Sequence, residues 1–321
     1  MTQDPLAPTD NPAPQIALYR CRHGSMLHRA NDQVIGASLR DYGEWAEEEL
    51  FLLSHLLEAG NWALDLGANI GSHSLAFCRF VAKTGRVISI DAQSAAFHLL
   101  VANLLINNAE QAVPMCAIAG NHCGIEFIPA EARPKTNLGG ATFVNRREGL
   151  AKKSASADLL IPVLCTTIDS LHLRHCDLIK IDVEGMELEV LQGAEATLRR
   201  FSPVIYFEQT SSARFEETVS YLRRLDYVFY WHVSRPFNRN NLRGTTHNIF
   251  GTSVEVNVLA APSKRSLPDV VLSQVTPIPA AKYEPPVPAI DISGWALPED
   301  AYLKLPPLER EIFDREALAS A

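Results

Sequence analysis

The fold expected for this chain is decided by the stretch WALDLGANIGSH, residues 62–73. It starts as a short apolar strand, turns at Gly67 and continues past Gly71 into a helix predicted over 72–81. Gly67 permits a sharp turn and a close backbone approach to a ligand, and Gly71 lets the helix start nearby. The free N–H groups and positive dipole end of that helix suit a carboxylate or phosphate. The stretch therefore favours a ligand-binding strand–turn–helix unit over a bare turn.

Strands and helices alternate on the C-terminal side of this stretch. Strands are predicted at 86–90, 113–118, 177–183, 203–207 and 227–233. A helix through residue 107 is predicted between the strands at 86–90 and 113–118, and further helices at 186–200 and 214–225. Almost all of these strands are apolar, which is typical of a parallel sheet covered on both faces. The fold class is therefore α/β, with a Rossmann-like, mostly parallel sheet.

Composition changes along the chain predict its domain organisation. Residues 1–14 carry four prolines and are expected to be a disordered leader. Residues 15–60 form an N-terminal cap with a helix at 44–58, in which Glu47, Glu48 and Glu49 oppose an apolar stripe. The catalytic domain is placed at 61–262, with an insertion at 120–162 that helps to shape a binding pocket. Residues 263–321 form a proline-rich, acidic tail, expected to be disordered and outside that domain, with one helix at 308–318.

Charge and composition restrict the function classes. The net charge of −8 and the short basic runs argue against nucleic acid as a partner. None of the six cysteines forms a C-x-x-C pair, so no metal site is expected. No apolar run approaches the roughly 20 residues that cross a membrane. The N-terminus lacks the features of a signal peptide, so a cytoplasmic protein is expected.

The glycine turn differs from nucleotide-binding loops. Asn69 stands where a dinucleotide-binding loop has its second glycine, and no Gly-Lys-Ser/Thr follows as in a P-loop. Asp65, directly before the turn, would repel a pyrophosphate but can offset the positive charge of S-adenosylmethionine. Asp91 ends the next strand, in the position where a carboxylate meets ribose hydroxyls.

A second motif, IKIDVEGME at 179–187, places Asp182 and Glu184 at the carboxyl end of another strand. Ligands bind at this end of open α/β sheets. Two close carboxylates can act as a base, hold substrate hydroxyls or bind a cation. Alternatively, Glu184 only favours the start of the following helix. That alternative leaves Lys180 and Asp182 unexplained, because polar residues in an apolar strand need partners.

With these motifs the sequence resembles the FkbM family of methyltransferases over roughly residues 41–262. Weaker support comes from PVIYFE at 203–208 and NVLA at 257–260. The resemblance implies a class I methyltransferase fold, a seven-stranded sheet whose antiparallel last strand, 253–259, lies beside 227–233. It also implies that Asp65, Gly67, Asn69 and Gly71 line the methionine part of S-adenosylmethionine. By the same resemblance, Asp91 holds the ribose, and Asp182 and Glu184 lie at the methyl-transfer face. The family more often has Glu-Pro where this chain has Asp91-Ala92.

The expected function is S-adenosylmethionine-dependent O-methylation of a hydroxyl on a sugar, glycan or natural product. The chain lacks the Asn/Asp-Pro-Pro-Tyr and Pro-Cys motifs of amine and cytosine-carbon methylation, and the family resemblance supports the same choice. Asp182 is the first candidate for the base, and His73, interpreted mainly as a helix-surface residue, is another. Two alternatives stay open, a catalytically inactive adaptor and a nicotinamide-dependent oxidoreductase.

Overall fold

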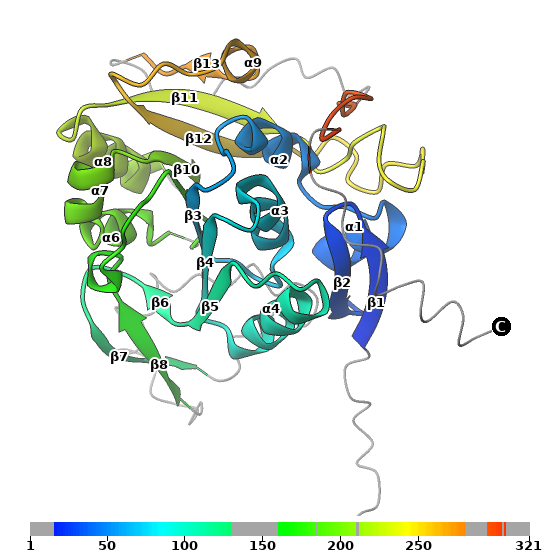
Figure 1. Cartoon of the computed structure of the whole chain (residues 1–321), viewed down its shortest axis with the longest axis horizontal. Helices are drawn as coiled ribbons and strands as arrows, with labels where there is room; N and C mark the ends of the chain where they lie inside the picture. The colour runs from blue at the N-terminus through cyan, green and yellow to red at the C-terminus, as the bar shows by residue number, and fades with distance from the viewer. Residues whose placement is uncertain are drawn as a thin grey trace, which may run out of the picture.

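A computed structural model describes residues 16–129, 160–183, 185–209, 212–279, 294–303 and 305. Its centre is an eight-stranded sheet in the order β13-β11-β12-β10-β9-β3-β4-β5, with helices on both faces (Figure 1). The strands are β3 (Trp62–Leu66), β4 (Arg86–Asp91), β5 (Ala112–Cys116), β9 (Leu178–Ile181), β10 (Val204–Glu208), β11 (Tyr227–Ser234), β12 (Glu255–Pro262) and β13 (Thr276–Pro277).

The strand directions confirm the predicted fold class. β3 pairs in parallel with β4 and β9, β4 with β5, and β9 with β10. β12 runs antiparallel between β10 and β11 and pairs with β11 along its whole length, from Pro262↔Tyr227 to Glu255↔Ser234. This is the reversed last strand of the class I methyltransferase fold. The short β13 adds an eighth strand at the edge.

The strands are apolar on both faces because helices cover both. Leu64, Ile179 and Ile205 belong to the core cluster on the side of α6 (Glu187–Gln192), α7 (Glu195–Phe201) and α8 (Ser212–Arg223). Ala63 and Val204 belong to the opposite cluster, which includes α2 (Glu47–Ser54) and α3 (Ser72–Val81). The core therefore lies in two layers around the sheet.

The single helix predicted at 186–200 is divided into α6 and α7 near Gly193. A Cβ atom on Gly193 would lie 2.0 Å from the backbone oxygen of Gly120. The close approach of these two backbones explains why only glycine fits there.

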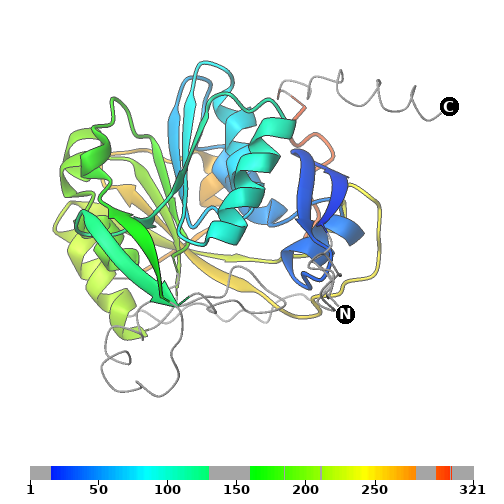
Figure 2. The ribbon, with the colours of Figure 1, turned by 90° about the horizontal axis from the view of Figure 1, so that it is seen from below.

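The N-terminal cap consists of the hairpin β1 (Ile16–Cys21) and β2 (Gly24–Arg29), followed by α1 (Ile35–Asp41) and α2. The hairpin stands beside α4 (Ser94–Ile106), on the side away from α8 (Figure 2). The side chains of Asn103 and Asn107 accept hydrogen bonds from the backbone N–H groups of Leu27 and Ser25. The cap is thereby joined to the domain by its backbone.

The predicted helix at 44–58 is observed in its central part as α2, but its glutamates are not on an open face. Glu47, Glu48 and Glu49 are all buried, because the cap hairpin, β12 and the end of β11 with the residue after it cover them. His23 lies 2.8 Å from Glu47, Arg235 lies 2.8 Å from Glu48, and the Ser234 hydroxyl donates to Glu49 at 2.8 Å. The helix is covered on both sides.

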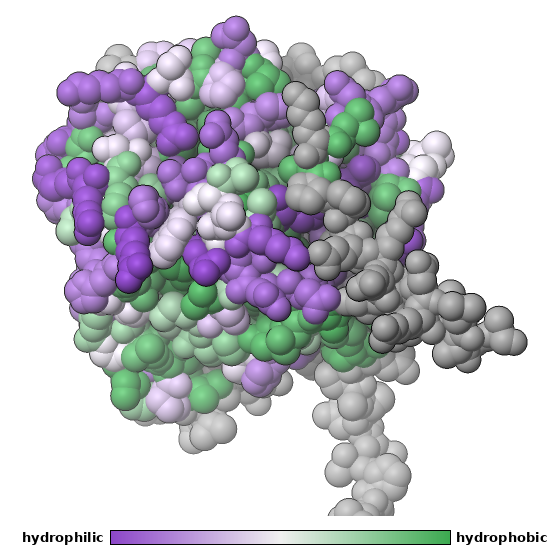
Figure 3. Space-filling model, viewed as in Figure 1, coloured by the Kyte–Doolittle hydropathy of each residue, from purple (hydrophilic) through white to green (hydrophobic). Residues whose placement is uncertain are grey.

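The insertion at 120–162 is described only at its ends. β6 (Ile118–Ala119), β7 (Gly124–Pro129) and β8 (Leu160–Thr166) form a separate three-stranded sheet. Ile125, Phe127 and Leu164 are exposed on it, and Figure 3 shows apolar side chains gathered in this part of the surface. The strand-like segment expected at 141–144 lies outside the described residues.

The segment after Pro262 differs from the expected tail wherever it is described. β13 pairs with β11, and α9 (Asp269–Leu272) buries Val271 in the core beside α2 and α3. Further along, Trp295 lies against Phe51, with ring centroids 5.9 Å apart, and Tyr302 stacks on Phe80 at 5.7 Å. These parts pack on the domain because they supply apolar groups to it. The leader at 1–14 and the helix expected at 308–318 lie outside the described residues.

In the described part of the chain, no helix combines the length and apolar character needed to cross a bilayer. Over those same residues, no group of three or more histidine, cysteine or acidic side chains is arranged to hold a metal ion.

Candidate functional site

The polar residues singled out in the sequence meet at one edge of the sheet. β3, β4, β9 and β10 run parallel, so their carboxyl ends lie at the same edge. β12 runs in the opposite direction, so its first residue, Glu255, lies there too. This edge is where ligands bind in open α/β sheets.

The loop between β3 and α3 has a backbone that requires its glycines. Gly67 and Gly71 have φ values of +78° and +91°, and Asn69 adopts a left-handed conformation at +50°. A Cβ atom on Gly67 would lie 1.7 Å from the backbone oxygen of Asp182. The loop is therefore pressed against the end of β9, so only glycine fits at this position. Asn69 Oδ1 is buried, and no hydrogen-bond partner for it is found among the described residues.

Asp91 fixes this loop from the neighbouring strand. Its Oδ2 accepts the backbone N–H of Asn69 at 2.8 Å, and its Oδ1 accepts that of Gln93 at 2.7 Å. Burial raises the pKa of Asp91 to about 7 against the lowering effect of these two hydrogen bonds, and the negative charges of Asp65 and Asp182 add to the rise. Each oxygen keeps a lone pair, so a donor such as a ribose hydroxyl can still bind.

Asp65 is fully buried beneath α3. The Ser74 hydroxyl donates to Asp65 Oδ2 at 2.6 Å, and Ser74 in turn lies 2.7 Å from the Ser89 hydroxyl. On the other side, Lys180 Nζ lies 3.6 Å from Asp65 Oδ1. In this geometry Asp65 faces a serine and a lysine of the chain itself. Its contact with the cofactor stays a prediction.

Asp182 is the more accessible carboxylate of the site. Its backbone N–H donates to Leu66 O at 2.8 Å, which aligns the end of β9 with the end of β3. Its side chain is 44% exposed, and Lys180 Nζ lies 3.2 Å from Oδ2. Asp182 is thus placed both next to the glycine loop and open to a ligand. Glu184, the other acid of the motif, lies outside the described residues.

Lys180 is a buried cation, and the sequence alone did not show which residues pair with it. Burial lowers the pKa of Lys180, but Asp182 and Asp65 outweigh that effect and hold it above its usual value. Both carboxylates therefore share one positive charge.

Two glutamates outside the recognised motifs complete the edge. Glu49 accepts hydrogen bonds from Ser234 and Asn257 at 2.8 and 2.9 Å, and its carboxyl group is also hydrogen-bonded to Glu255. Burial, followed by the charge of Glu49, raises the pKa of Glu255 well above its usual value. Neither residue lies in a motif, so no sequence signal distinguishes them from surface glutamates.

His73 is buried, so its interpretation as a helix-surface residue is wrong. Its Nε2 lies 3.4 Å from Glu49 Oε2. Since α2 covers this part of α3, the histidine contacts the cap.

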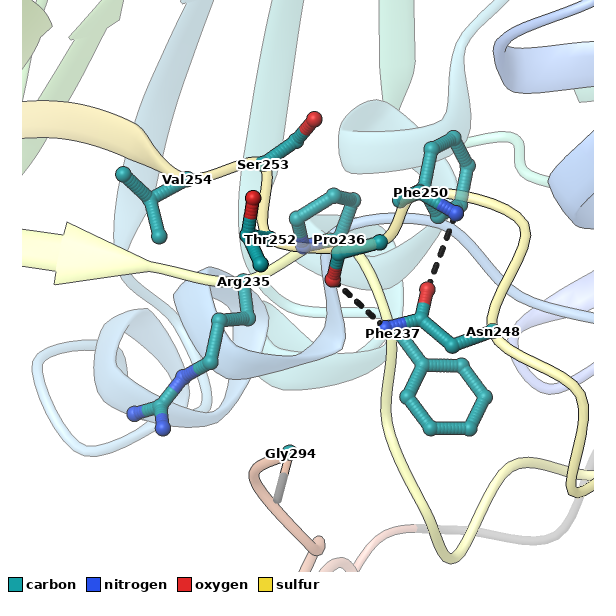
Figure 4. A pocket seen from close by; sticks show the side chains of 10 residues that line it. Arg235, Pro236, Phe237, Asn248, Phe250, Thr252, Ser253, Val254 and Gly294 are labelled. Carbon is teal, nitrogen blue, oxygen red and sulfur yellow. Dashed lines mark hydrogen bonds between the residues drawn. The ribbon is translucent and has the colours of Figure 1, made fainter. Parts of the chain in front are cut away.

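A shallow hollow opens beside the site, in the connection between β11 and β12 (Figure 4). Asn248 braces this connection, accepting the N–H of Phe250 at 2.9 Å and donating to Gly251 O at 2.8 Å. The hollow is lined by Arg235, Pro236, Phe237, Asn248, Phe250, Gly251, Thr252, Ser253, Val254 and Gly294. Ser253 and Val254 lead directly into Glu255, so the hollow adjoins the carboxylates of the edge.

The family model described as the methyltransferase FkbM domain matches residues 65–229, a little more than half of the chain. A search of curated proteins found no relative that matches.

Among solved structures, the chain is similar to the FkbM methyltransferase from Methylobacillus flagellatus KT, with 17% identity and a TM-score of 0.41. That match covers 63% of this chain and 43% of the other, so this chain spans less than half the length of that protein. Aeropyrum pernix fibrillarin with natively bound S-adenosyl-L-methionine matches with 11% identity, TM-score 0.39 and coverage of 77% and 82%. The O-methyltransferase TomG from Streptomyces achromogenes, in complex with SAM, matches with 12% identity, TM-score 0.37 and coverage of 67% and 80%.

Proposed function

The chain belongs to the FkbM methyltransferase family, and from this premise we propose that it methylates a hydroxyl of a sugar, glycan or natural product. The observation that carries the proposal is the position of Asp182. Its accessible carboxylate directly follows β9, and its backbone oxygen lies against Gly67 of the cofactor loop. A proton acceptor is thereby placed beside the loop that binds the methyl donor.

S-adenosylmethionine is the cofactor of this family and supplies a methyl group already activated on a sulfonium. The residues present fit it. Asn69 offers a buried oxygen that lacks a partner in the described structure, and the loop has no room for a side chain at Gly67. In this proposal Gly67, Asn69 and Gly71 hold the methionine part, and Asp91 accepts from the ribose. Asp65 supports the same loop from below, through Ser74.

Asp182 acts as the base in this proposal. It takes the proton of the acceptor hydroxyl as that oxygen bonds to the methyl carbon and the carbon–sulfur bond breaks, its electron pair remaining on sulfur. The glycine loop and Asp91 contribute mainly by holding the donor at close range for in-line transfer. Glu184 is proposed to lie at the same face. The transferase domain is proposed to span 61–262, and the acceptor to be a small molecule or glycan.

The test begins with binding of S-adenosylmethionine and S-adenosylhomocysteine, measured by calorimetry on the wild-type protein and on Asp182→Asn. Formation of S-adenosylhomocysteine is then followed with a panel of hydroxylated glycosides. Asp182→Asn should lower turnover by about 100-fold or more, the usual effect of losing a general base, and leave affinity for S-adenosylmethionine within a few-fold.

Glu195→Gln is the matched control, because Glu195 is an exposed carboxylate on α7 whose partners in the described part of the chain are side chains of α7 and α8. It should behave like wild type. If folded wild-type protein binds neither compound, the transferase proposal is lost and the adaptor takes its place. If Asp182→Asn abolishes cofactor binding, Asp182 is a cofactor contact and not the base.

A further inference from the structure

Lys180 occupies a central position between the cofactor loop and the accessible carboxylate of the site. It lies on β9, and its side chain is only 5% exposed. Its Nζ is 3.2 Å from Asp182 Oδ2 and 3.6 Å from Asp65 Oδ1. A buried ammonium group requires such compensation, because an unpaired charge in the interior is strongly unfavourable.

The two carboxylates that share Lys180 have different surroundings. Asp65 is fully enclosed, and its other oxygen accepts from Ser74. Asp182 is 44% exposed and reaches the open edge of the sheet. Lys180 therefore holds Asp182 by one oxygen from the protein side and leaves the rest of the carboxylate accessible to a ligand.

We propose that Lys180 is a positioning residue, which holds Asp182 back from the cofactor sulfonium and thereby reserves it for the acceptor hydroxyl. The inference rests on the proposed function and goes beyond it. A carboxylate beside a sulfonium would pair with that cation if it were free to move. An ion pair of this kind would favour the positively charged donor and would leave the acceptor without a base.

Other charged side chains also face the ion pair of Lys180 and Asp182. Asp91 comes from β4, Glu49 from α2 and Glu255 from β12, and each interacts electrostatically with Lys180 or Asp182. All three are acidic. Lys180 is therefore the positive group that balances this side of the edge in the described structure.

A simpler role for Lys180 would be to neutralise the buried Asp65. The double variant Lys180→Met/Asp65→Asn separates the two roles. It removes one positive and one negative charge, so the three residues together keep a net charge of −1, now carried by Asp182 alone. The double variant therefore leaves no unpaired charge at positions 65 and 180, whereas Asp182 has lost the ammonium group that holds it.

The experiment measures the dissociation constants of S-adenosylmethionine and S-adenosylhomocysteine by calorimetry. The two compounds differ in the sulfonium charge, so their affinity ratio reports whether Asp182 has moved towards it. In the double variant the preference for S-adenosylmethionine should rise about fivefold, as expected for one partly exposed ion pair. Adding Asp182→Asn should abolish the rise.

Tyr206→Phe is the matched control. Tyr206 is buried next to Lys180 in the sheet and bonds to His232 at 2.7 Å, so its loss disturbs the same layer without touching Asp182. Its affinity ratio should equal that of wild type. If the methionine variant does not fold, Lys180→Gln/Asp65→Asn takes its place with the same expectation.

A ratio that stays within twofold of wild type in the folded double variant would overturn the proposal and leave Lys180 as a counter-ion for Asp65. A rise that persists after Asp182→Asn would also overturn it. Failure of the proposed function gives a different result, because wild-type protein would then bind neither compound.

Discussion

Asp91 has a structural role at this site and, in the proposed function, a binding role. Its two oxygens already hold the backbone of the glycine loop and of the turn after β4, and the same carboxylate faces the expected ribose. Its pKa is raised to about 7, mainly by burial. Its folded-state pKa lies above the ordinary value of 3.8, so its effect on stability falls between about pH 4 and 7. Within that window the folded state loses stability as the pH rises, because Asp91 ionises in the unfolded chain while it keeps its proton in the folded one.

Cofactor binding should show the opposite dependence on pH. Ribose hydroxyls donate best to the ionised carboxylate, so affinity for S-adenosylhomocysteine should increase between pH 6 and 8, with release of about half a proton near pH 7. Calorimetry in two buffers of different ionisation enthalpy measures that proton. Asp91→Asn should bind S-adenosylhomocysteine more weakly. Any pH dependence of affinity that remains in this variant comes from the amino group of the cofactor. A wild-type profile identical to that of the variant would contradict the assignment.

The recognised residues were predictable because each carries a local signal. Asp65, Asp91 and Asp182 are carboxylates at the ends of apolar strands, and parallel strands bring such ends together. The direction of the Asp65 side chain was not predictable. It depends on Lys180 and Ser74, which lie on two other elements.

At the scale of elements, α2 connects three distant parts of the chain. Glu47 binds the cap hairpin, Glu48 binds the exit of β11, and Glu49 binds both β11 and β12. The sequence predicted the helix from its apolar stripe. It gave no sign that the opposite side is covered, because Ser234 and Asn257 follow Glu49 by 185 and 208 positions. A periodic pattern reports one buried face, whereas long-range contacts decide the other.

Removal of the Glu49 carboxylate should be strongly destabilising. Glu49→Ala leaves the Ser234 and Asn257 donors buried without their acceptor, each costing about 1 to 3 kcal/mol, so the free energy of unfolding should fall by roughly 2 to 6 kcal/mol. Denaturant unfolding measures the change. Glu58→Ala, an exposed glutamate in the segment that follows α2, should change it by less than about 0.5 kcal/mol. Equal effects of the two substitutions would contradict a buried role for Glu49.

At the scale of the whole molecule, the two ends of the described chain pack against each other. Tyr302 contacts His23 of the cap hairpin and Phe80 of α3, and Trp295 contacts Phe51 of α2. The proline-rich composition predicted a tail, because composition indicates only the local conformation of a segment. It does not indicate where isolated aromatic residues pack. Deletion of everything after Pro262 would therefore remove part of the core.

Two adjacent residues test this packing. Tyr302→Ala should lower the free energy of unfolding by about 2 to 3 kcal/mol, since it removes a ring packed between the cap and α3. Leu303→Ala should have almost no effect, because that side chain is 76% exposed. Chemical denaturation compares the two. A similar small effect for both would show that the segment does not contribute to the core.

β12 runs in reverse and comes late in the chain, so some residues at the carboxyl edge of the sheet are synthesised long after the others. Synthesis on the ribosome releases the glycine loop, Asp91 and Asp182 early, together with all residues that the family model matches. Glu49 by then has emerged without Ser234 and Asn257, its later partners. A nascent chain that stops before residue 255 therefore carries the glycine loop but lacks Asn257, one of the two sheet residues that bind Glu49. Glu255 at the edge of the sheet and Asn257, which binds Glu49 of α2, therefore come from the same late strand.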